Sequence, residues 1–221
     1  LRLEALPEGA AVGTGSPRRR AQLLRRRPDL VVVDIRGNVD TRLGRVLDPA
    51  TEPERRLEAV VLAAAGLRRL GRDAVVTQTL DLGVWPSAPA QGALAVEMSS
   101  DADAGLREIV ASSDHPFSRL AAQVERDVLR TLEAGCAAPL GVSARVTGGL
   151  DLDGGSGSGV VTVSASVYAL DGSDEVTVGA TCALGDAAGL GAVVAHDLLD
   201  SGAGDLAPLG ARSTGSAGAR S

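Results

Sequence analysis

The first third of the chain alternates short apolar runs with segments of helical periodicity. Residues 11–14, 30–35 and 58–63 are rich in Ala, Val and Leu, and each run precedes a stretch in which apolar residues recur every three or four positions. Strands that alternate with helices are typical of a largely parallel sheet with right-handed crossovers. This part of the sequence therefore predicts an α/β unit.

The segment 13–27, GTGSPRRRAQLLRRR, connects the first predicted strand to a helix. Ser16 suits the N-cap position and Pro17 the first helical position. A turn of this kind presents backbone N–H groups and the positive end of the helix dipole to an anion. The segment also contains six arginines in fifteen residues, which strengthens the prediction of an anionic ligand.

The pattern changes after residue 84. Residues 84–91, VWPSAPAQ, are typical of a connection or hinge, and 92–98, GALAVEM, predict another strand. Apolar positions between Phe117 and Leu132 recur at helical spacing and predict an amphipathic helix over about 116–133.

The last third of the sequence predicts a small α+β unit. Strands are expected at 141–147, 159–170 and 175–183, with a loose loop at 148–159. A helix over about 187–200 would place Leu190, Val193, Val194 and Leu198 on one face. We expect the tail after about residue 210 to be disordered.

Composition narrows the class of protein. Hydrophobic residues make up 44% of the chain, but Trp, Tyr and Phe occur once each, so the core must consist mainly of Ala, Val and Leu. The sequence has neither a run of about 18 apolar residues nor the pattern of a signal peptide at its start. Cys136 and Cys182 form no zinc-ligand spacing. We expect a cytoplasmic protein without a membrane segment, a metal site or a disulfide.

Positive charge is concentrated in the first part of the chain. Residues 1–72 contain fifteen arginines and nine acidic residues, although the whole chain has a net charge of -6. All 22 basic residues are arginines, so the positions of the arginines carry more information than their identity. A basic part in an acidic chain indicates an anionic partner.

The positions of these arginines indicate a ligand with several carboxylates. Six arginines follow the predicted strands of the first unit: Arg18, Arg19, Arg36, Arg42, Arg68 and Arg69. The C-terminal ends of parallel strands line one edge of a sheet, where ligands bind. Each guanidinium can hold a carboxylate through two hydrogen bonds, worth about 1.5–3 kcal/mol apiece. We expect Arg25, Arg26 and Arg27, in contrast, to solvate a helix C-terminus.

Other site chemistries have weaker support. Nucleic-acid binding normally adds aromatic stacking, and the first 84 residues contain no aromatic residue. On its local sequence alone, Cys136 suits either a small buried hydrophobe or a functional thiol, whereas Cys182 suits a buried position in a strand. His115 and His196 form no catalytic constellation.

Five motifs in order resemble the porphobilinogen deaminase (hydroxymethylbilane synthase) family. They are VGTGSPRRRAQL, DIRGNVDTRL, EAVVLAAAGLRRLG, APAQGALAVE and ERDVLRTLEAGCAAPLG, within residues 6–141. The last motif matches the family's cysteine signature at Glu125, Arg126, Val128, Leu132, Gly135, Cys136, Pro139, Leu140 and Gly141. Ala134 and Ala138 stand where Gly and a β-branched residue are usual.

The resemblance implies a transferase of tetrapyrrole, and hence porphyrin and haem, biosynthesis. Such an enzyme condenses four porphobilinogen molecules, with loss of ammonia, onto a dipyrromethane cofactor held by Cys136 through a thioether. Each pyrrole bears an acetate and a propionate, which would explain the arginines. Residues that match the family's cofactor and substrate contacts are Ser16, Arg18, Arg19, Arg36, Arg42 and Arg69; Arg20 and Arg68 have no firm counterpart. The expected partners are porphobilinogen and the growing oligopyrrole, bound by a monomer that takes neither nucleic acid nor membrane.

The resemblance also implies a domain order. Residues 1–85 would form an α/β lobe similar to periplasmic binding proteins, 86–112 a hinge with the returning part of a first domain, and 113–221 an α+β domain. The family's catalytic Asp belongs to a first-domain segment without a counterpart here, so no catalytic residue is expected in this sequence, which resembles a fragment. The alternative is a non-enzymatic polycarboxylate-binding module, for which the cysteine loop would be superfluous.

We therefore expect the 221-residue chain to form no hydroxymethylbilane when it is incubated alone with porphobilinogen. The reason is that a carboxylate must stabilise the cationic electrophile of this reaction. Product formation is measured by mass spectrometry, with a family member that contains the first-domain segment as the positive control. Turnover by the chain alone would contradict the expectation.

Overall fold

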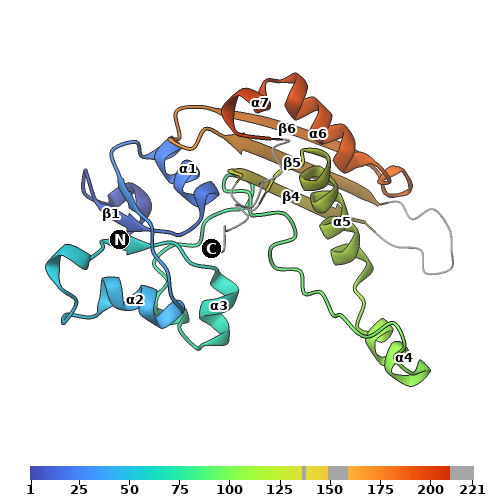
Figure 1. The fold of residues 1–221 in the computed structure, drawn as a ribbon, viewed down its shortest axis with the longest axis horizontal. Helices are drawn as coiled ribbons and strands as arrows, with labels where there is room; N and C mark the ends of the chain where they lie inside the picture. Colours follow the sequence, from blue (N-terminus) through green and yellow to red (C-terminus); the bar gives the residue numbers. More distant parts are fainter. Residues whose placement is uncertain (136–137, 149–158, 210–221) are drawn as a thin grey trace, which may run out of the picture.

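The computed structural model describes residues 1–135, 138–148 and 159–209 of the chain. It contains two three-stranded sheets, a parallel one in the first part of the chain and an antiparallel one in the last part (Figure 1). Cys136, most of the loop expected at 148–159 and the tail expected after about residue 210 lie outside the described residues.

The first unit has the predicted parallel sheet. Its strands are β1 (Ala11–Gly13), β2 (Val31–Val33) and β3 (Ala59–Val60), in the order β2-β1-β3. Helix α1 (Pro17–Arg26) connects β1 to β2, α2 (Val39–Leu47) connects β2 to β3, and α3 (Ala64–Arg69) follows β3. A small core of Leu6, Ala10, Val12, Leu23, Leu30 and Val32 supports the sheet. The alternation of strands and helices read from the sequence is confirmed.

Two capped helices begin at the same edge of this sheet. Ser16 caps α1 by accepting a hydrogen bond from the Arg19 N–H at 3.4 Å, and Asn38 caps α2 by accepting one from the Thr41 N–H at 2.8 Å. A Cβ at Gly15 would stand 2.6 Å from the Ile35 carbonyl oxygen, so glycine lets the turn before α1 pass against the backbone that follows β2. The sequence thus brings the N-terminus of α1 close to the segment that leads to α2.

A long connection joins the two units. The strand expected at 92–98 is wrong, because these residues are exposed and irregular, and the side chain of Leu94 is 90% exposed. A strand needs a neighbour to satisfy its N–H and C=O groups, and no strand of the described chain pairs with this segment. Helix α4 (Ala104–Ser112), which the sequence analysis did not anticipate, follows the connection.

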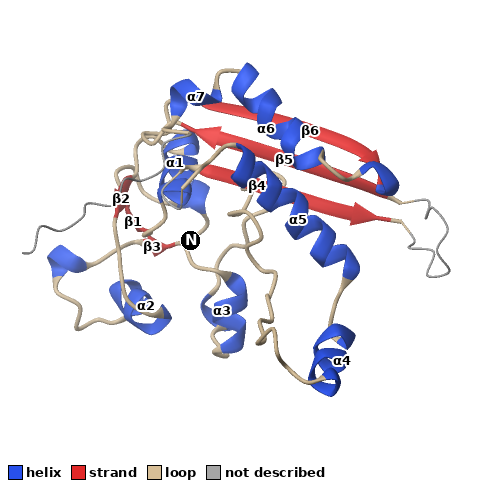
Figure 2. Cartoon of the chain, turned by 45° about the vertical axis from the view of Figure 1, so that its right-hand side comes forward, coloured by secondary structure: helices blue, strands red, loops and turns tan. Residues whose placement is uncertain are grey.

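The second unit is the predicted α+β module. Strands β4 (Leu140–Thr147), β5 (Val160–Tyr168) and β6 (Glu175–Ala183) form the antiparallel sheet in that order. Helices α5 (Pro116–Thr131) and α6 (Leu190–Asp200) cover one face of the sheet, and α7 (Ala203–Leu206) follows α6 (Figure 2). Within the described residues, no helix has both the length and the apolar character needed to cross a bilayer.

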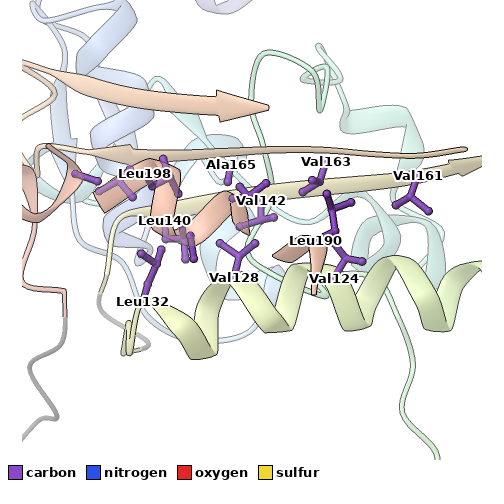
Figure 3. Close-up of a cluster of buried hydrophobic side chains, with 14 of the residues drawn as sticks. Val124, Val128, Leu132, Leu140, Val142, Val161, Val163, Ala165, Leu190 and Leu198 are labelled. Atoms are coloured by element: carbon purple, nitrogen blue, oxygen red, sulfur yellow. The ribbon is translucent and has the colours of Figure 1, made fainter. Parts of the chain in front are cut away.

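The main core lies between this sheet and its two helices. Val124, Val128 and Leu132 point from α5 and the residue after it toward Val142 and Val163 of the sheet (Figure 3). Val193 was expected on the buried face of α6 but is 53% exposed. The buried face of that helix consists of Leu190, Gly191, Val194, Ala195 and Leu198, and at 100° per residue Val193 lies on the other side.

The two units meet at residues 86–91, which we call the linker, and where α1 packs against β5 and the turn after it. Arg18 and Gln22 of α1 donate hydrogen bonds to the Pro86 carbonyl oxygen at 2.7 and 3.0 Å. Gln22 also donates to the Tyr168 hydroxyl of β5 at 3.4 Å. On the other side, the Val142 N–H of β4 donates to the Ser87 carbonyl oxygen at 2.8 Å. The linker is therefore hydrogen-bonded to both units.

Gly191 sets the close approach of α6 to α5. A Cβ at this position would lie 2.4 Å from the Val124 carbonyl oxygen and 2.7 Å from the Asp127 Cβ. We predict that Gly191→Ala lowers the free energy of unfolding by about 1–3 kcal/mol, because backbone atoms of α5 must move. The measurement is equilibrium unfolding in denaturant.

Gly204→Ala is the matched control, since Gly204 is also the second residue of a helix and a Cβ there would meet no atom within 4 Å. This substitution should be neutral or should stabilise the protein by up to about 1 kcal/mol through helix propensity. Equal effects of the two substitutions would contradict the packing argument.

Candidate anion-binding site

Three arginines form a cluster near the N-terminus of α1. Burial and, to a smaller extent, repulsion from Arg19 lower the pKa of Arg18 to about 10. Burial and then repulsion from Arg42 lower the pKa of Arg19. Arg19 is therefore close enough to repel Arg18, and Arg42 is close enough to repel Arg19. We call these three residues the arginine cluster.

The arginine cluster has no acidic partner in the described part of the chain. None of the ion pairs found among the described residues includes Arg18, Arg19 or Arg42. Arg19 donates to the Val61 carbonyl oxygen at 3.2 Å, while the Nε atoms of Arg18 and Arg42 are buried and have no protein acceptor. A buried donor without an acceptor costs about 1–3 kcal/mol. The cluster therefore suits an anion that supplies the acceptors.

The start of α1 adds to the positive potential of the cluster. Ser16 lies at the N-cap, and its N–H donates a hydrogen bond to the hydroxyl of the buried Thr14 at 3.3 Å. Helix α1 has ten residues, so its dipole places partial positive charge on the first turn, where Arg18 and Arg19 lie. Backbone and side chains thus favour negative charge at the same place.

The other predicted arginines are not brought into the cluster. The Arg36 side chain is 93% exposed and contacts Asp34 at 3.9 Å, and Arg69 is exposed in the last turn of α3. Arg68 and Arg69 were expected to converge with the other arginines at the ends of the strands, and the structure does not bring them there. The preceding residues form α3, which carries both arginines to its C-terminal end, roughly 9 Å from its start at 1.5 Å per residue.

Arg18 also has a structural role that the sequence analysis missed. Besides its hydrogen bond to Pro86, it donates to Gln22 Oε1 at 2.8 Å and to Gln91 Oε1 at 3.3 Å. The spacing of Arg18 and Gln22, one helical turn apart, could have indicated the first contact. The contacts with Pro86 and Gln91 join residues about seventy positions apart, which no local pattern reveals.

The arginines at the other end of α1 were expected to solvate the helix C-terminus, but their side chains bind other segments of the chain instead. Arg27 forms an ion pair with Asp29 at 2.6 Å, and the Arg26 guanidinium lies 4.5 Å from the centre of the Trp85 ring. Arg25 donates to the Ser173 carbonyl oxygen at 3.0 Å. These three residues therefore connect the helix end to neighbouring segments.

The two cysteines differ in what the structure shows. Cys136 follows α5 in the sequence but lies outside the described residues. Cys182, in β6, is half-buried, and burial together with the charge of Asp186 raises the pKa of its thiol. A raised pKa disfavours the reactive thiolate, so Cys182 is a poor attachment point.

Two family models match the chain. Residues 1–107 match "Porphobilinogen deaminase, dipyromethane cofactor binding domain", and residues 119–200 match "Porphobilinogen deaminase, C-terminal domain". The chain belongs to the porphobilinogen deaminase family. The family resemblance inferred from the five sequence motifs is thus confirmed.

Bacterial porphobilinogen deaminases are similar to the chain over most of its length. That of Cutibacterium acnes is 49% identical over 223 residues, which cover 95% of the chain and 66% of the relative. Those of Leifsonia xyli subsp. xyli and Corynebacterium glutamicum are each 46% identical, over 95% and 96% of the chain and 62% and 65% of the relatives. The chain therefore spans less than two thirds of the length of these curated relatives.

The arginine cluster fits the cofactor named by the first family model. A dipyrromethane built from two pyrroles, each with an acetate and a propionate, presents several carboxylates. The cluster offers guanidinium groups without acidic partners and two buried N–H donors without acceptors. Its charge and its unused donors complement such a group.

We predict that Arg19→Gln weakens anion binding without lowering the stability of the protein. Binding of citrate, a simple polycarboxylate probe, should weaken about 10- to 150-fold, the equivalent of about 1.5–3 kcal/mol for a charge-assisted hydrogen bond. The thermal midpoint of the ligand-free protein should not fall, because the substitution removes a buried charge repelled by Arg42. Calorimetric titration and thermal unfolding measure the two effects.

The control is Arg20→Gln on the same helix. Arg20 is exposed and donates to the Val32 carbonyl oxygen at 2.8 Å, so its loss should change citrate affinity less than about 3-fold. Equal weakening by both substitutions would show that net charge, rather than the arginine cluster, determines binding.

Proposed function

We propose that this protein acts as a hydroxymethylbilane synthase, which condenses four porphobilinogen molecules stepwise, with release of ammonia, in tetrapyrrole biosynthesis. The observation that carries the proposal is the arginine cluster without acidic partners, within the region that matches a dipyrromethane cofactor binding domain. The relatives named porphobilinogen deaminase support it.

In this proposal the chain's own residues bind and orient carboxylates. Arg19 and Arg42 hold the acetate and propionate groups nearest α1, and the positive end of the helix dipole, at the turn that Ser16 caps, adds to their attraction. Arg18 contributes its Nε atom while its two terminal nitrogens hold the linker. Arg36 and Arg69, which are exposed, would meet carboxylates further along the ligand. When attached to Cys136, the dipyrromethane supplies the pyrrole carbon onto which substrate is added.

We assign no catalytic acid or base to this sequence. The arginine cluster itself supplies cations, which position carboxylates but cannot stabilise a cationic electrophile. The Asp34 carboxylate lies beside the turn before α1, where it contacts Arg36, and we give it no role in the reaction. The proposal therefore gives this chain the binding of cofactor and substrate, and it leaves the chemical step unassigned.

The proposal includes the organisation of the chain. Residues 1–85 would form a lobe similar to one half of a periplasmic binding protein, 86–112 a hinge and the returning part of another domain, and 113–221 the domain that carries Cys136. The two sheets and the linker between them support this division. We further propose a cytoplasmic monomer that binds porphobilinogen and the growing oligopyrrole.

A non-enzymatic polycarboxylate-binding module is the second candidate, since the arginine cluster alone would serve it. Covalent attachment at Cys136 distinguishes the two functions. In the protein expressed from its complete gene, we predict that the wild type has an intact mass above that of its polypeptide by one dipyrromethane. Cys136→Ser should have the polypeptide mass, because serine cannot form the thioether.

Cys182→Ser is the matched control for this measurement. Its thiol is half-buried in β6 and has a raised pKa, so the variant should keep the added mass. Intact-mass spectrometry under denaturing conditions measures all three proteins. A Cys136→Ser variant that keeps the added mass would contradict the attachment site, and a wild type without it would favour the binding module.

A further inference from the structure

Glu125 is a buried carboxylate that joins three segments of the chain. It lies on α5 and is 9% exposed. Its Oε2 atom accepts a hydrogen bond from the Ala90 N–H of the linker at 2.6 Å, and its Oε1 atom accepts one from the Ala144 N–H of β4 at 2.7 Å. The pKa of Glu125 is raised, because the effect of burial exceeds the opposing effect of these two hydrogen bonds. Both oxygens of the side chain are thus used by backbone donors.

The contact with Ala144 is part of a covered sheet edge. Strand β4 pairs with β5 on one side only, so its outward N–H groups need other acceptors. The Val142 N–H donates to Ser87 of the linker and the Ala144 N–H to Glu125. The linker and Glu125 therefore accept hydrogen bonds from N–H groups two residues apart on the free edge of β4, where alternate N–H groups of a strand point outward.

The contact with Ala90 holds a strained residue. Ala90 has a φ of 59°, in the left-handed region that a residue with a Cβ rarely adopts. Such a conformation persists where surrounding contacts determine it. The Glu125 hydrogen bond to the Ala90 N–H is one such contact, and Gln91, the next residue, is held by Arg18 on the other unit.

Glu125 and Arg18 therefore act on the same short segment from opposite units. Arg18 belongs to the arginine cluster and binds Pro86 and Gln91 at the two ends of the linker. Glu125 binds Ala90 and lies on the helix that precedes Cys136 in the sequence. Hydrogen bonds from the two units thus hold the linker at both of its ends, at Pro86 and at residues 90–91.

We propose that Glu125 is a positioning residue: its carboxylate fixes the linker and the edge of β4 to α5, and so sets the place of α5 relative to the arginine cluster. The consequence for the reaction rests on the proposed function, because it is the ligand attached at Cys136 that must reach those arginines. Nothing in this role requires Glu125 to touch substrate or cofactor.

The test compares Glu125→Gln with Val128→Ala in the protein expressed from its complete gene. Glutamine keeps the shape but has one acceptor oxygen instead of two. Val128 is fully buried on the same helix and belongs to the main core, and its apolar side chain offers the linker no hydrogen bond. Its variant therefore reports a loss of stability alone. Hydrogen exchange of the Ala90 and Ala144 amides, relative to amides of β5, is measured with kcat and KM for porphobilinogen and with the mass bound at Cys136.

In Glu125→Gln we expect at least one of the two amides to exchange about 10-fold faster relative to β5, the effect of losing one hydrogen bond. We expect kcat per folded molecule to fall about 10- to 100-fold through misplacement, with KM changed less than about 3-fold and the mass at Cys136 retained. Val128→Ala should keep the relative exchange rates and kcat per folded molecule.

Two results would overturn the proposal: unchanged relative exchange at both amides in Glu125→Gln, or the same kcat per folded molecule in the two variants. A wild type with no turnover and no added mass would instead refute the proposed function. The exchange data would then still decide whether Glu125 holds the linker.

Discussion

The arrangement of the two units depends on the hydrogen bonds made by the six-residue linker, together with the direct contacts of α1 with β5 and the turn after it. The Pro86 carbonyl oxygen accepts from Arg18 and Gln22 of the first unit, and the next carbonyl, that of Ser87, accepts from Val142 of the second. A Cβ at Gly141 would lie 2.8 Å from Pro86, so the strand start also packs directly on the linker. Because these bonds are buried or partly buried, losing one leaves a donor or an acceptor without a partner.

The arginine cluster is the electrostatic counterpart of this arrangement. Placing Arg19 between Arg18 and Arg42 costs stability, since burial and mutual repulsion both act against the charges. None of the ion pairs found among the described residues includes Arg18, Arg19 or Arg42. The carboxylates of a bound ligand would attract these guanidinium groups, which repel one another in the ligand-free protein. The same groups that destabilise the ligand-free protein would then contribute to the binding free energy. The loss of stability and the capacity to bind an anion therefore both come from the positive charges of the arginine cluster.

Local sequence patterns predicted the elements but not their long-range partners. Apolar periodicity identified the parallel strands and α5, and the Ser16–Pro17 pair identified the start of α1, because these features depend on neighbouring residues. The strand expected at 92–98 failed because a strand also needs a neighbour. Arg69 does not converge with the other arginines because the helix predicted after the third strand, α3, carries it away from the sheet. The linker contacts of Arg18 and Glu125 join residues 35 to 73 positions apart, which periodicity cannot show.

The choice of a carboxylate at position 125 follows from the donors around it. Two backbone N–H groups, those of Ala90 and Ala144, converge on one side chain and require two acceptor oxygens. A glutamine would offer one oxygen and turn an NH2 group toward the second N–H, so a donor would face a donor. An apolar residue would leave both N–H groups without acceptors at about 1–3 kcal/mol each. Burying a charge is unfavourable by itself, and the pKa of Glu125 stays raised because the two hydrogen bonds compensate only part of the effect of burial. The same two hydrogen bonds join α5, β4 and the linker through a single residue.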